Sequence, residues 1–421
     1  MPQLPRDSAP DSTLALLSEG YAFIPNRCRR YGTDIFETRL MLRKAVCMQG
    51  EEAARVFYAP GRFTRRGALP ASVLRLLQDK GSVATLDGEA HQARKRMFMA
   101  LMTPESIARL ADAMADEWQM CFPRWEGMER VVLHDEVRAI LCRAVCRWAG
   151  IPLPDAEVAQ RTRELGAMID NAGKIGPRNW HATLLRRRTE RWLRRVVRAL
   201  RHGRLNAPDG SALQLFARQP DPRGGLLRTA VVAVELLNLL RPTVAVARFV
   251  TFAALALHEH PEWRRRLLDG EAEELECFVQ EVRRFYPFFP LVAGRALEGF
   301  EWRGHRFARG DWVLLDLYGT GHDSRIWKEP ETFRPDRFRA WDHSAFGLIP
   351  QGGGDHHLNH RCAGEWVTIE LMKRAVRLLT AGMRYEVPEQ DLRIDLSRMP
   401  TLPRSGFIIS RVRRAPVTAV S

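Results

Sequence analysis

A single cysteine in a glycine-rich loop constrains this chain more than any other feature. The loop reads Gln-Gly-Gly-Gly-Asp-His-His-Leu-Asn-His-Arg-Cys-Ala-Gly-Glu-Trp over residues 351–366, with the thiol at Cys362. Residues 363–371 have the pattern of a helix that begins at this cysteine. Backbone N–H groups and a helix dipole stabilise thiolate in such a place, and thiolate is the form that ligates a soft metal or haem iron. Ala363 and Gly364 let a large planar cofactor approach the backbone closely.

Two other interpretations of the cysteine are open. A lone buried cysteine is most often an inert small hydrophobic residue. His356, His357 and His360 share the loop with Cys362, so four potential zinc ligands lie in one short segment. Zinc sites of known type mostly take paired ligands from two separated elements, and the sequence has only this one cluster. Zinc is therefore the weaker interpretation of the loop.

Two segments upstream of the loop decide between these interpretations. Glu281 and Arg284 lie three residues apart on one face of an expected helix from Leu275 to Tyr286. Next come Phe-Tyr-Pro-Phe-Phe-Pro over residues 285–290 and Phe-Arg-Pro-Asp-Arg-Phe over residues 333–338, followed by the cysteine loop. This order and spacing resemble the cytochrome P-450 superfamily over nearly the whole chain.

The resemblance implies a cytochrome P-450 fold, mainly α with a minor β-sheet part, and haem b (iron protoporphyrin IX) as the cofactor. In that family Cys362 would ligate the haem iron, and Glu281, Arg284 and Arg337 would form a buried charge triad that braces the cysteine loop. A buried triad stabilises only when all its members are paired, so each single removal is expected to be severe.

Length and composition agree with one large domain in a reducing compartment. A chain of 421 residues with 45% hydrophobic content can bury a large core. No linker, repeat or low-complexity tract divides it, so we expect a single haem-thiolate domain over residues 1–421. The first ten residues lack an apolar signal core, and seven scattered cysteines do not form a disulfide framework, so a cytoplasmic protein is expected.

The longest apolar run, Thr229 to His258, is long enough to be mistaken for a membrane span. It contains Glu235, Arg241 and Arg248, and each charge near the middle of a span is expensive in lipid. A long central helix of a soluble protein fits the run better, so no transmembrane segment is expected.

Hydrophobic periodicity predicts the arrangement of the remaining elements. Most of residues 92–280 is expected to be helical. Before this region we expect short helices over 11–30, strands over 35–42 and 44–49, and a helix over 51–58. After it we expect a hairpin of 300–307 with 311–317 that turns at Arg309-Gly310, and a small terminal sheet within 383–414.

The specific function turns on residues 238–245, Asn-Leu-Leu-Arg-Pro-Thr-Val-Ala. Pro242 has no N–H, so the carbonyl of Asn238 loses its helical partner and the helix should kink there. In ordinary members of the superfamily the kink carries an acidic residue and a threonine that deliver protons, whereas this chain has Arg241 and Pro242. A buried guanidinium is costly without an anion, and its fork geometry matches a carboxylate. The alternative is that Arg241 reaches the surface or pairs with Glu235.

This Arg-Pro helix resembles the fatty-acid peroxygenase branch of the superfamily, whose members hydroxylate or decarboxylate long-chain fatty acids with hydrogen peroxide. The resemblance implies that Arg241, beside Pro242, anchors the substrate carboxylate above the iron, and that this carboxylate supplies the missing acid–base group. Thiolate donation from Cys362 would favour cleavage of the peroxide O–O bond. Tethering would leave only Cα and Cβ of the fatty acid within reach, and no reductase would be obligatory.

Four basic residues are candidates for contacting the haem propionates. Residues 87–95, Asp-Gly-Glu-Ala-His-Gln-Ala-Arg-Lys, resemble the family helix that touches the propionates, which gives that role to His91 and Lys95. Arg66 and Arg295 are further candidates, because carboxylates that face a protein interior need cations or donors. Ordinary surface charge is the alternative for each of the four.

Three residues are assigned to the substrate pocket. Phe288 and Phe289 are expected to line its distal side, with core packing as the alternative. Ala84 stands where relatives tend to place His or Gln near the substrate's Cβ, so this position gives no basis for predicting hydroxylation or decarboxylation. In the cysteine loop, Asp355 and Leu358 replace the usual Phe and Gly of the superfamily, whereas the run of three glycines matches the peroxygenase branch better.

A net charge of +15 and one basic segment raise other classes of partner. Residues 186–204 are rich in arginine and could bind nucleic acid. However, Trp192, Leu193 and Val197 belong to an apolar stripe at helical spacing, so a packed helix with a solvated basic face is the better interpretation and no nucleic-acid partner is expected. Basic charge can also attract fatty acids, membrane surfaces or an acidic electron-transfer protein. The last possibility defines the alternative function, a reductase-dependent monooxygenase of the same fold that acts on another carboxylate substrate.

Overall fold

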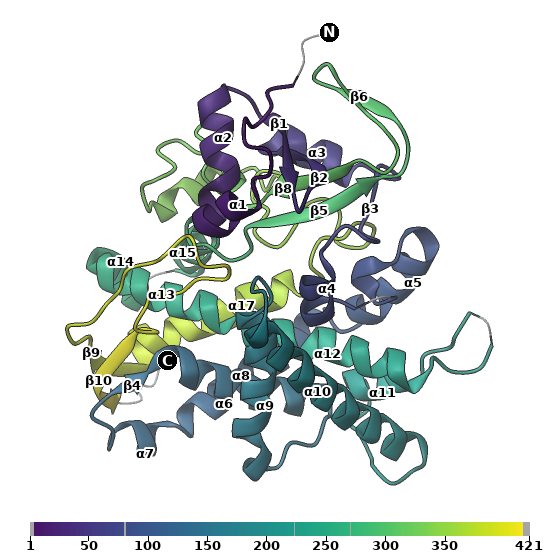
Figure 1. Ribbon diagram of the computed structural model, residues 1–421. Helices are drawn as coiled ribbons and strands as arrows, with labels where there is room; N and C mark the ends of the chain where they lie inside the picture. The colour runs from purple at the N-terminus through teal and green to yellow at the C-terminus, as the bar shows by residue number, and fades with distance from the viewer. Residues whose placement is uncertain (1–3, 80, 223, 270, 416–421) are drawn as a thin grey trace.

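Helices make up most of the protein (Figure 1). The structure is a computed structural model that describes residues 4–79, 81–222, 224–269 and 271–415. Its α-helices are α1 Thr13–Glu19, α2 Phe23–Tyr31, α3 Glu51–Tyr58, α4 Ala71–Leu77, α5 Gly88–Met99, α6 Pro104–Gln119, α7 Phe122–Trp125, α8 Leu133–Ala149, α9 Asp155–Asp170, α10 Pro177–Arg201, α11 Ala212–Ala217, α12 Thr229–Ala245, α13 Ala247–Glu259, α14 Pro261–Asp269, α15 Ala272–Phe285, α16 Tyr318–Gly321 and α17 Glu365–Arg377.

The strands form small sheets. One sheet has the order β1-β2-β8-β5-β3, in which only β2 and β8 pair in parallel. A second sheet has the order β4-β10-β9, and β6 pairs with β7. The strands are β1 Ile35–Leu40, β2 Arg43–Met48, β3 Phe63–Thr64, β4 Val131–Val132, β5 Leu291–Ala296, β6 Phe300–Trp302, β7 His305–Phe307, β8 Trp312–Asp316, β9 Met383–Glu386 and β10 Ile408–Arg414. The prediction of a mainly helical fold with a minor sheet is confirmed.

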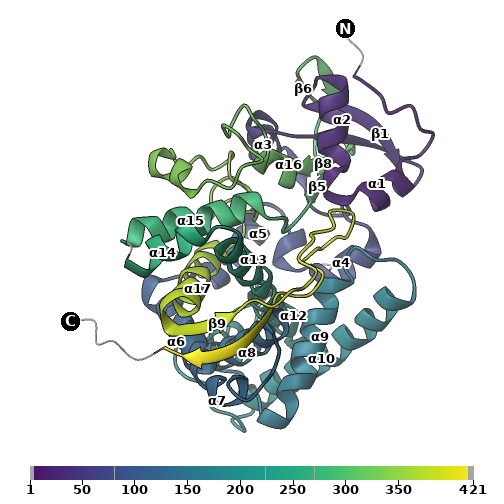
Figure 2. The same cartoon turned by 90° about the vertical axis from the view of Figure 1, so that its left-hand side faces the viewer.

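The two kinds of structure occupy different parts of the molecule. Figures 1 and 2 show the larger sheet beside α1, α2 and α3 at the top, and the helical part below it. Helix α12 contacts α8, α9, α10 and α11, and α17 contacts α6, α13 and α15. The cysteine loop lies in the chain between β8 of the larger sheet and α17 of the helical part, and it leads directly into α17.

The long apolar run forms α12 and α13 in the centre of the helical part. This stretch, Thr229–Glu259, is long and apolar enough to cross a membrane, but most of it is buried inside the protein. It therefore packs as a core helix. The break expected at Pro242 falls four residues later, at Val246, between the two helices. The hydroxyl of Thr243 donates to the carbonyl of Leu239 at 2.9 Å, and this bond supports the turn that follows the proline.

Two turn predictions need correction. The first strand ends at Leu40 rather than residue 42, because Met41 and Leu42 have positive φ angles of 53° and 60° and form the turn to β2. The later hairpin turns at Arg303-Gly304, with φ angles of 48° and 72°, and not at Arg309-Gly310. Residues 312–316 instead pair with β5 and β2 inside the larger sheet.

Asp316 ends β8 and is buried. Its Oδ1 accepts a hydrogen bond from the N–H of Gly319 at 2.9 Å. Burial raises the pKa of this carboxyl group to about 8. Because the folded-state pKa lies above the unfolded one, this group's contribution to stability is lost as pH rises from about 4 to about 8.

Replacing Asp316 with asparagine should therefore flatten the pH dependence of the unfolding free energy. Near pH 9 we expect the variant to be more stable than the parent by about 1–3 kcal/mol, the order of a buried unsatisfied polar group. Urea unfolding at pH 5, 7 and 9 measures this, with the exposed Asp342→Asn as the matched control. Parallel pH profiles for Asp316→Asn and the parent would contradict the prediction.

Candidate active site

The cysteine loop is held by backbone geometry that needs its glycines. The N–H of Cys362 donates to the carbonyl of Gln351 at 3.0 Å and thereby closes the loop. Gly352 has a φ of 91°, and a Cβ at this position would lie 3.0 Å from the hydroxyl of Tyr58. The helix that follows begins at Glu365, not at the cysteine as predicted, because residues 363–364 form a turn before it.

Protein surrounds the thiol of Cys362 except where it lines the large internal cavity described below. Burial raises the pKa of this thiol, and the negative charge of Glu365 adds to the effect. A hydrogen bond from the backbone of Gly364 and the positive charge of Lys95 act in the opposite direction. The loop alone therefore does not favour thiolate, whereas a cation bound in the cavity would.

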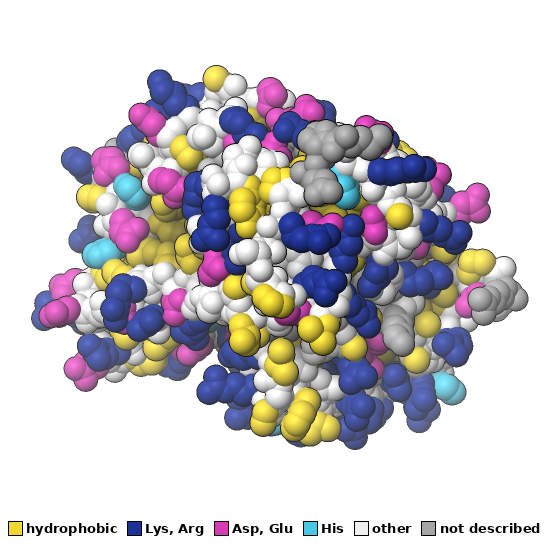
Figure 3. Space-filling model, turned by 45° about the horizontal axis from the view of Figure 1, so that its top comes forward, with side chains coloured by type: hydrophobic (Ala, Val, Ile, Leu, Met, Phe, Trp, Pro, Cys, Tyr) yellow, Lys and Arg dark blue, Asp and Glu magenta, His cyan; other side chains and the backbone are white. Residues whose placement is uncertain are grey.

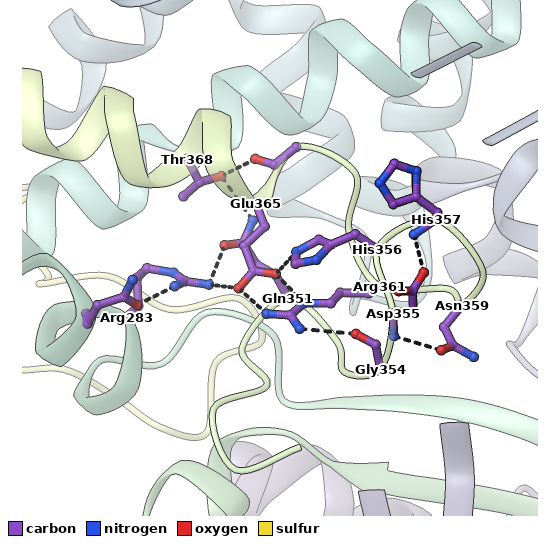
Figure 4. Close-up of polar contacts among 12 residues, drawn as sticks. Arg283, Gln351, Gly354, Asp355, His356, His357, Asn359, Arg361, Glu365 and Thr368 are labelled. Atoms are coloured by element: carbon purple, nitrogen blue, oxygen red, sulfur yellow. Dashed lines mark hydrogen bonds and ion pairs between the residues drawn. The ribbon is translucent and has the colours of Figure 1, made fainter. Parts of the chain in front are cut away.

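Glu365 holds the cysteine loop through three cationic or donor side chains (Figure 4). Arg283 contacts its carboxylate at 2.5 Å, Arg361 at 2.6 Å and His356 at 3.1 Å. These charges, together with hydrogen bonds from His356 and Arg361, hold the pKa of Glu365 well below its usual range despite burial. Glu365, Arg283 and Arg361 were not predicted as site residues. The spacing of Arg361 and Glu365 by four residues on the loop and α17 was the available signal.

The residues predicted as a charge triad lie together; Glu281 and Arg284 are buried and Arg337 is half-buried. Nε of Arg284 is 2.7 Å from Glu281, and Nε of Arg337 is 3.2 Å from the same carboxylate. The remaining donors of the two arginines bind backbone carbonyls of residues 321 and 328–332. In the described part of the chain these contacts hold residues 321 and 328–332, which precede the cysteine loop. The triad was expected to brace the cysteine loop itself, so that expectation is corrected.

A cavity of about 550 Å³ connects the cysteine loop to the central helix. Cys362 and Arg241 both line it, so the structure brings together the predicted metal ligand and the predicted carboxylate anchor in one cavity wall. The wall is mostly apolar, and its other members include Phe98, Met102, Trp148, Ile169, Ala172, Leu239, Pro242, Val246, Phe288 and Val367.

The guanidinium of Arg241 is held in place by neutral acceptors. Its side chain donates to the carbonyls of Leu76 and Leu77 and to Oδ1 of Asn238, the first and last at 3.1 Å. Arg241 is only 5% exposed, and burial together with the charge of Arg186 lowers its pKa to about 9. No carboxylate pairs with it among the residues that the structure describes. It therefore stays a cation at pH 7 that has no anionic partner among those residues.

The carboxylate considered as an alternative partner of Arg241 is engaged elsewhere. Glu235 binds Arg94 at 2.6 Å and accepts from the backbone N–H of Val83 at 2.9 Å. Its second oxygen accepts from Nδ2 of Asn238 at 3.1 Å. Asn238 therefore bridges the acid and Arg241, and Arg241 neither pairs with Glu235 nor reaches the surface.

One side of the cavity is lined by basic groups, but not by all those predicted. His91 and Lys95 line it and are buried, and burial lowers their pKa values to about 4 and about 8. Nζ of Lys95 also donates to the carbonyls of Asn359 and Arg361, so it fastens α5 to the cysteine loop. Arg65 lines the cavity too and lies over the ring of Phe57 at 4.4 Å.

Arg66 and Arg295 need correction as cofactor contacts. Arg66 is exposed and is not among the residues that line the cavity, whereas its neighbour Arg65 is. Arg295 donates instead to the carbonyls of Gly67 and Gly310, at 2.9 and 3.0 Å. Its guanidinium thereby links the turn at Gly67 to the turn at Gly310, and Arg295 is not among the residues that line the cavity.

The three residues assigned to the substrate pocket all line the cavity. Phe288 is buried and stacks on Phe249 with ring centroids 4.2 Å apart. Phe289 is 40% exposed, so it lies toward the opening. Ala84 belongs to the short 3-10 helix Val83–Thr85, which Glu235 holds through its bond to Val83.

The zinc interpretation finds no support in the loop. His356 binds Glu365, and the ring of His360 lies 4.0 Å from that of His91. Among the described residues, no group of three or more His, Cys, Asp or Glu side chains is arranged to hold a metal ion.

Comparison with known proteins identifies the family. The Cytochrome P450 family profile matches residues 273–392. A variant of cytochrome P450SP alpha (CYP152B1) is 47% identical, with 97% of this chain and 100% of that chain covered and a TM-score of 0.94. The chain belongs to the CYP152 group of cytochromes P450.

Two further structures of this cytochrome P450 group carry fatty acids. Cytochrome P450EX alpha (CYP152N1) with myristic acid is 43% identical over 98% of this chain and 100% of that chain, with a TM-score of 0.95. A variant of cytochrome P450 OleT in complex with arachidonic acid is 36% identical over 99% of each chain, with a TM-score of 0.96. By sequence alone, the chain is 33% identical to the curated Rhazimal synthase of Alstonia scholaris over 138 residues, which cover 28% of each protein.

The residues of this cytochrome P450 fit the haem that the family binds. Cys362 offers one sulfur ligand at the cavity wall, and Ala363 and Gly364 beside it leave space for a flat ring. Arg65, His91 and Lys95 offer the cations and donors that two propionates need in an interior. When bound, a haem with a thiolate ligand supplies the oxidising chemistry of an oxidoreductase.

Proposed function

We propose that this cytochrome P450 is a peroxygenase that uses hydrogen peroxide to oxidise long-chain fatty acids at Cα or Cβ. Hydroxylation is the expected outcome, with decarboxylation to a terminal alkene as a second product class. The observation that carries the proposal is the buried Arg241, which lines the same cavity as Cys362 and has no carboxylate partner among the described residues. Fatty acids bound in two structures of the same group support the substrate class.

Arg241 is oriented for a carboxylate that comes from outside the protein. The Leu76 and Leu77 carbonyls and Asn238 accept from both terminal nitrogens, and this fixes the guanidinium in the cavity wall. A buried cation surrounded by neutral acceptors gains much from a charged partner. The mostly apolar wall then suits the hydrocarbon tail of the same ligand.

The bound carboxylate would also do the acid–base work. Neither Arg241 nor Pro242 can donate and regain a proton at neutral pH. A substrate carboxylate held by Arg241 can exchange a proton with peroxide in hydrogen-bond reach, which the side chains at this turn cannot do. Because the head group is held, the carbons next to it are presented for oxidation.

Product analysis tests the proposal directly. The purified haem-loaded protein is mixed with hydrogen peroxide and tetradecanoic acid, without any reductase. Products oxidised at Cα or Cβ are expected, and Cys362→Ala should lose both these products and the thiolate-ligated absorption spectrum. Turnover only with a reductase and NAD(P)H would instead establish the reductase-dependent monooxygenase.

The proposal also covers partners and place of action. The protein would need a fatty acid and hydrogen peroxide, no obligatory reductase and no nucleic acid, and it would act in the cytoplasm as a single haem domain over residues 1–421. Burial of α12 and α13 in the protein core supports the absence of a membrane span.

Asn238 offers a sharper test of carboxylate recruitment. Asn238→Asp would place an anion next to Arg241, and this internal anion should compete with the substrate head group. We expect KM for tetradecanoic acid to rise about tenfold in Asn238→Asp and only about threefold in Asn238→Ala, which loses one hydrogen bond. Steady-state kinetics on haem-loaded variants measure this. An equal KM for the two variants would contradict the proposal that Arg241 binds the substrate carboxylate because it has no anionic partner of its own.

A further inference from the structure

Helix α10 carries an exposed stripe that the proposed reaction does not use. Trp180, Leu184, Arg187, Arg191, Arg195 and Arg198 follow one another at spacings of three or four residues, so they share one helix face. Trp180 is 67% exposed and Leu184 is 58% exposed. The stripe is therefore apolar near the start of the helix and cationic along the rest.

The four arginines of this stripe are all exposed. No carboxylate pairs with Arg187, Arg191, Arg195 or Arg198 in the part of the chain that the structure describes. The single acid of the helix, Glu190, is buried and binds Arg186 and Arg194. The apolar residues predicted to pack inward, such as Trp192, Leu193 and Val197, are indeed buried. Beyond Leu184 the stripe therefore consists of four exposed arginines that no carboxylate pairs with among the described residues.

The apolar end of the stripe continues into the opening of the cavity. Ile175, just before α10, is 74% exposed and lines the cavity together with Lys174. Leu17 of α1 and Met41 of the β1–β2 turn line the same opening and are exposed hydrophobic residues, as are the neighbouring Leu14 and Leu42. In Figure 2, α1 and α10 both lie toward the right-hand side of the molecule. Figure 3 shows hydrophobic side chains beside a dense group of Lys and Arg at the lower edge of that view.

We propose that this face docks on an anionic lipid bilayer and takes up fatty acid from it. The inference rests on the proposed function for the identity of the cargo, but the docking itself does not. Ile175, Trp180 and Leu184 would enter the headgroup region, where tryptophan is favoured. The four arginines would lie along the lipid phosphates. The cavity opening would then face the bilayer, so a fatty acid could pass from lipid to Arg241 without crossing water.

The combination of features favours lipid over other anionic partners. A nucleic acid offers phosphates to the arginines, but it has no apolar surface for the exposed leucines, isoleucine and methionine around the opening. An acidic protein surface would pair with the arginines, but it would not account for the exposed apolar residues around the cavity opening. A bilayer matches the cationic part, the apolar part and the chemistry of the cavity together.

Vesicle sedimentation with the haem-loaded full-length protein tests the proposal. Vesicles of phosphatidylcholine with roughly a third phosphatidylglycerol are compared with phosphatidylcholine alone. The stripe variant is Arg187→Gln/Arg191→Gln/Arg195→Gln/Arg198→Gln. The matched control is Arg306→Gln/Arg309→Gln/Arg377→Gln/Arg384→Gln, which removes the same charge from exposed positions on other elements.

Binding to the anionic vesicles is expected for the parent and the control. The stripe variant should bind at least about a hundredfold more weakly, since each arginine near an anionic surface contributes about fivefold. Trp180→Ser/Leu184→Ser should weaken binding at high salt as well. Equal loss in the control, no binding by the parent, or tighter binding to duplex DNA than to vesicles would overturn the proposal.

Turnover separates this proposal from the enzymatic one. Tetradecanoic acid supplied in solution should be oxidised equally by the parent and the stripe variant, whereas acid supplied in anionic vesicles should be oxidised several-fold more slowly by the variant. Sedimentation needs no turnover, so an inactive parent that still binds vesicles would refute only the peroxygenase function. Equal rates from vesicles would refute delivery from the bilayer.

Discussion

Replacing Arg241 with glutamine should lower peroxide-driven turnover of long-chain fatty acids by at least about a hundredfold. The substitution keeps a polar side chain, but it would remove the proposed charge-assisted contact to the substrate carboxylate. A hundredfold loss corresponds to about 3 kcal/mol. Both kcat and kcat/KM should fall, because the carboxylate is expected to position the substrate and also to move the proton. Quantification of oxidised products by mass spectrometry measures the effect.

The spectrum of the same variant provides the control. Arg241 contacts α4 and Asn238 but not the cysteine loop, so Arg241→Gln should keep its haem and its thiolate-ligated spectrum. Arg241→Lys keeps a charge without the fork geometry, and it should fall between the parent and the glutamine variant. Turnover of tetradecanoic acid at the parental rate by Arg241→Gln, with the same oxidised carbons, would refute carboxylate anchoring.

The functional centre could be predicted from the sequence because its chemistry lies in local motifs. Cys362 and Arg241 each stand in a short segment with unusual composition, and the fold then places both on one cavity wall. The pairing of Glu281 with Arg284 was visible because both lie on one helix face.

Contacts between distant segments could not be read from the sequence in this way. Arg65 and Arg66 are neighbours of the same type, and only the end of β3 decides which of them faces the cavity. Arg283 and Glu365 are 82 residues apart, so no local periodicity predicts their ion pair. The turn at Arg303-Gly304 was missed because a positive φ at an arginine is unusual, and a glycine at residue 310 offered a competing turn.

Replacing Glu365 with glutamine should destabilise the protein by about 3–5 kcal/mol, because the change leaves buried cations without their anion. Arg283, Arg361 and His356 all contact this carboxylate. Arg361 and His356 come from the cysteine loop, and Arg283 comes from α15, the helix that also carries Glu281 and Arg284. The loop should therefore lose its shape before the rest of the fold. Chemical unfolding and the fraction of thiolate-ligated haem report the two effects separately.

The matched control lies on the same helix. Glu370 of α17 is partly exposed and has no ion pair among the described residues, so Glu370→Gln should change the unfolding free energy by less than about 0.5 kcal/mol. An equal loss in both variants would assign the effect to helix α17 rather than to the cluster around Glu365.

The pH dependence of this difference follows from the direction of the pKa shift. The folded protein holds the pKa of Glu365 below its unfolded value, so the stabilisation is present above about pH 5 and is lost as pH falls through the acid range. The gap between the parent and Glu365→Gln should therefore be widest near neutral pH and narrow steadily below pH 4. A gap that stays constant with pH would mean that the glutamine variant fails through packing, and the cysteine loop would then not depend on charge.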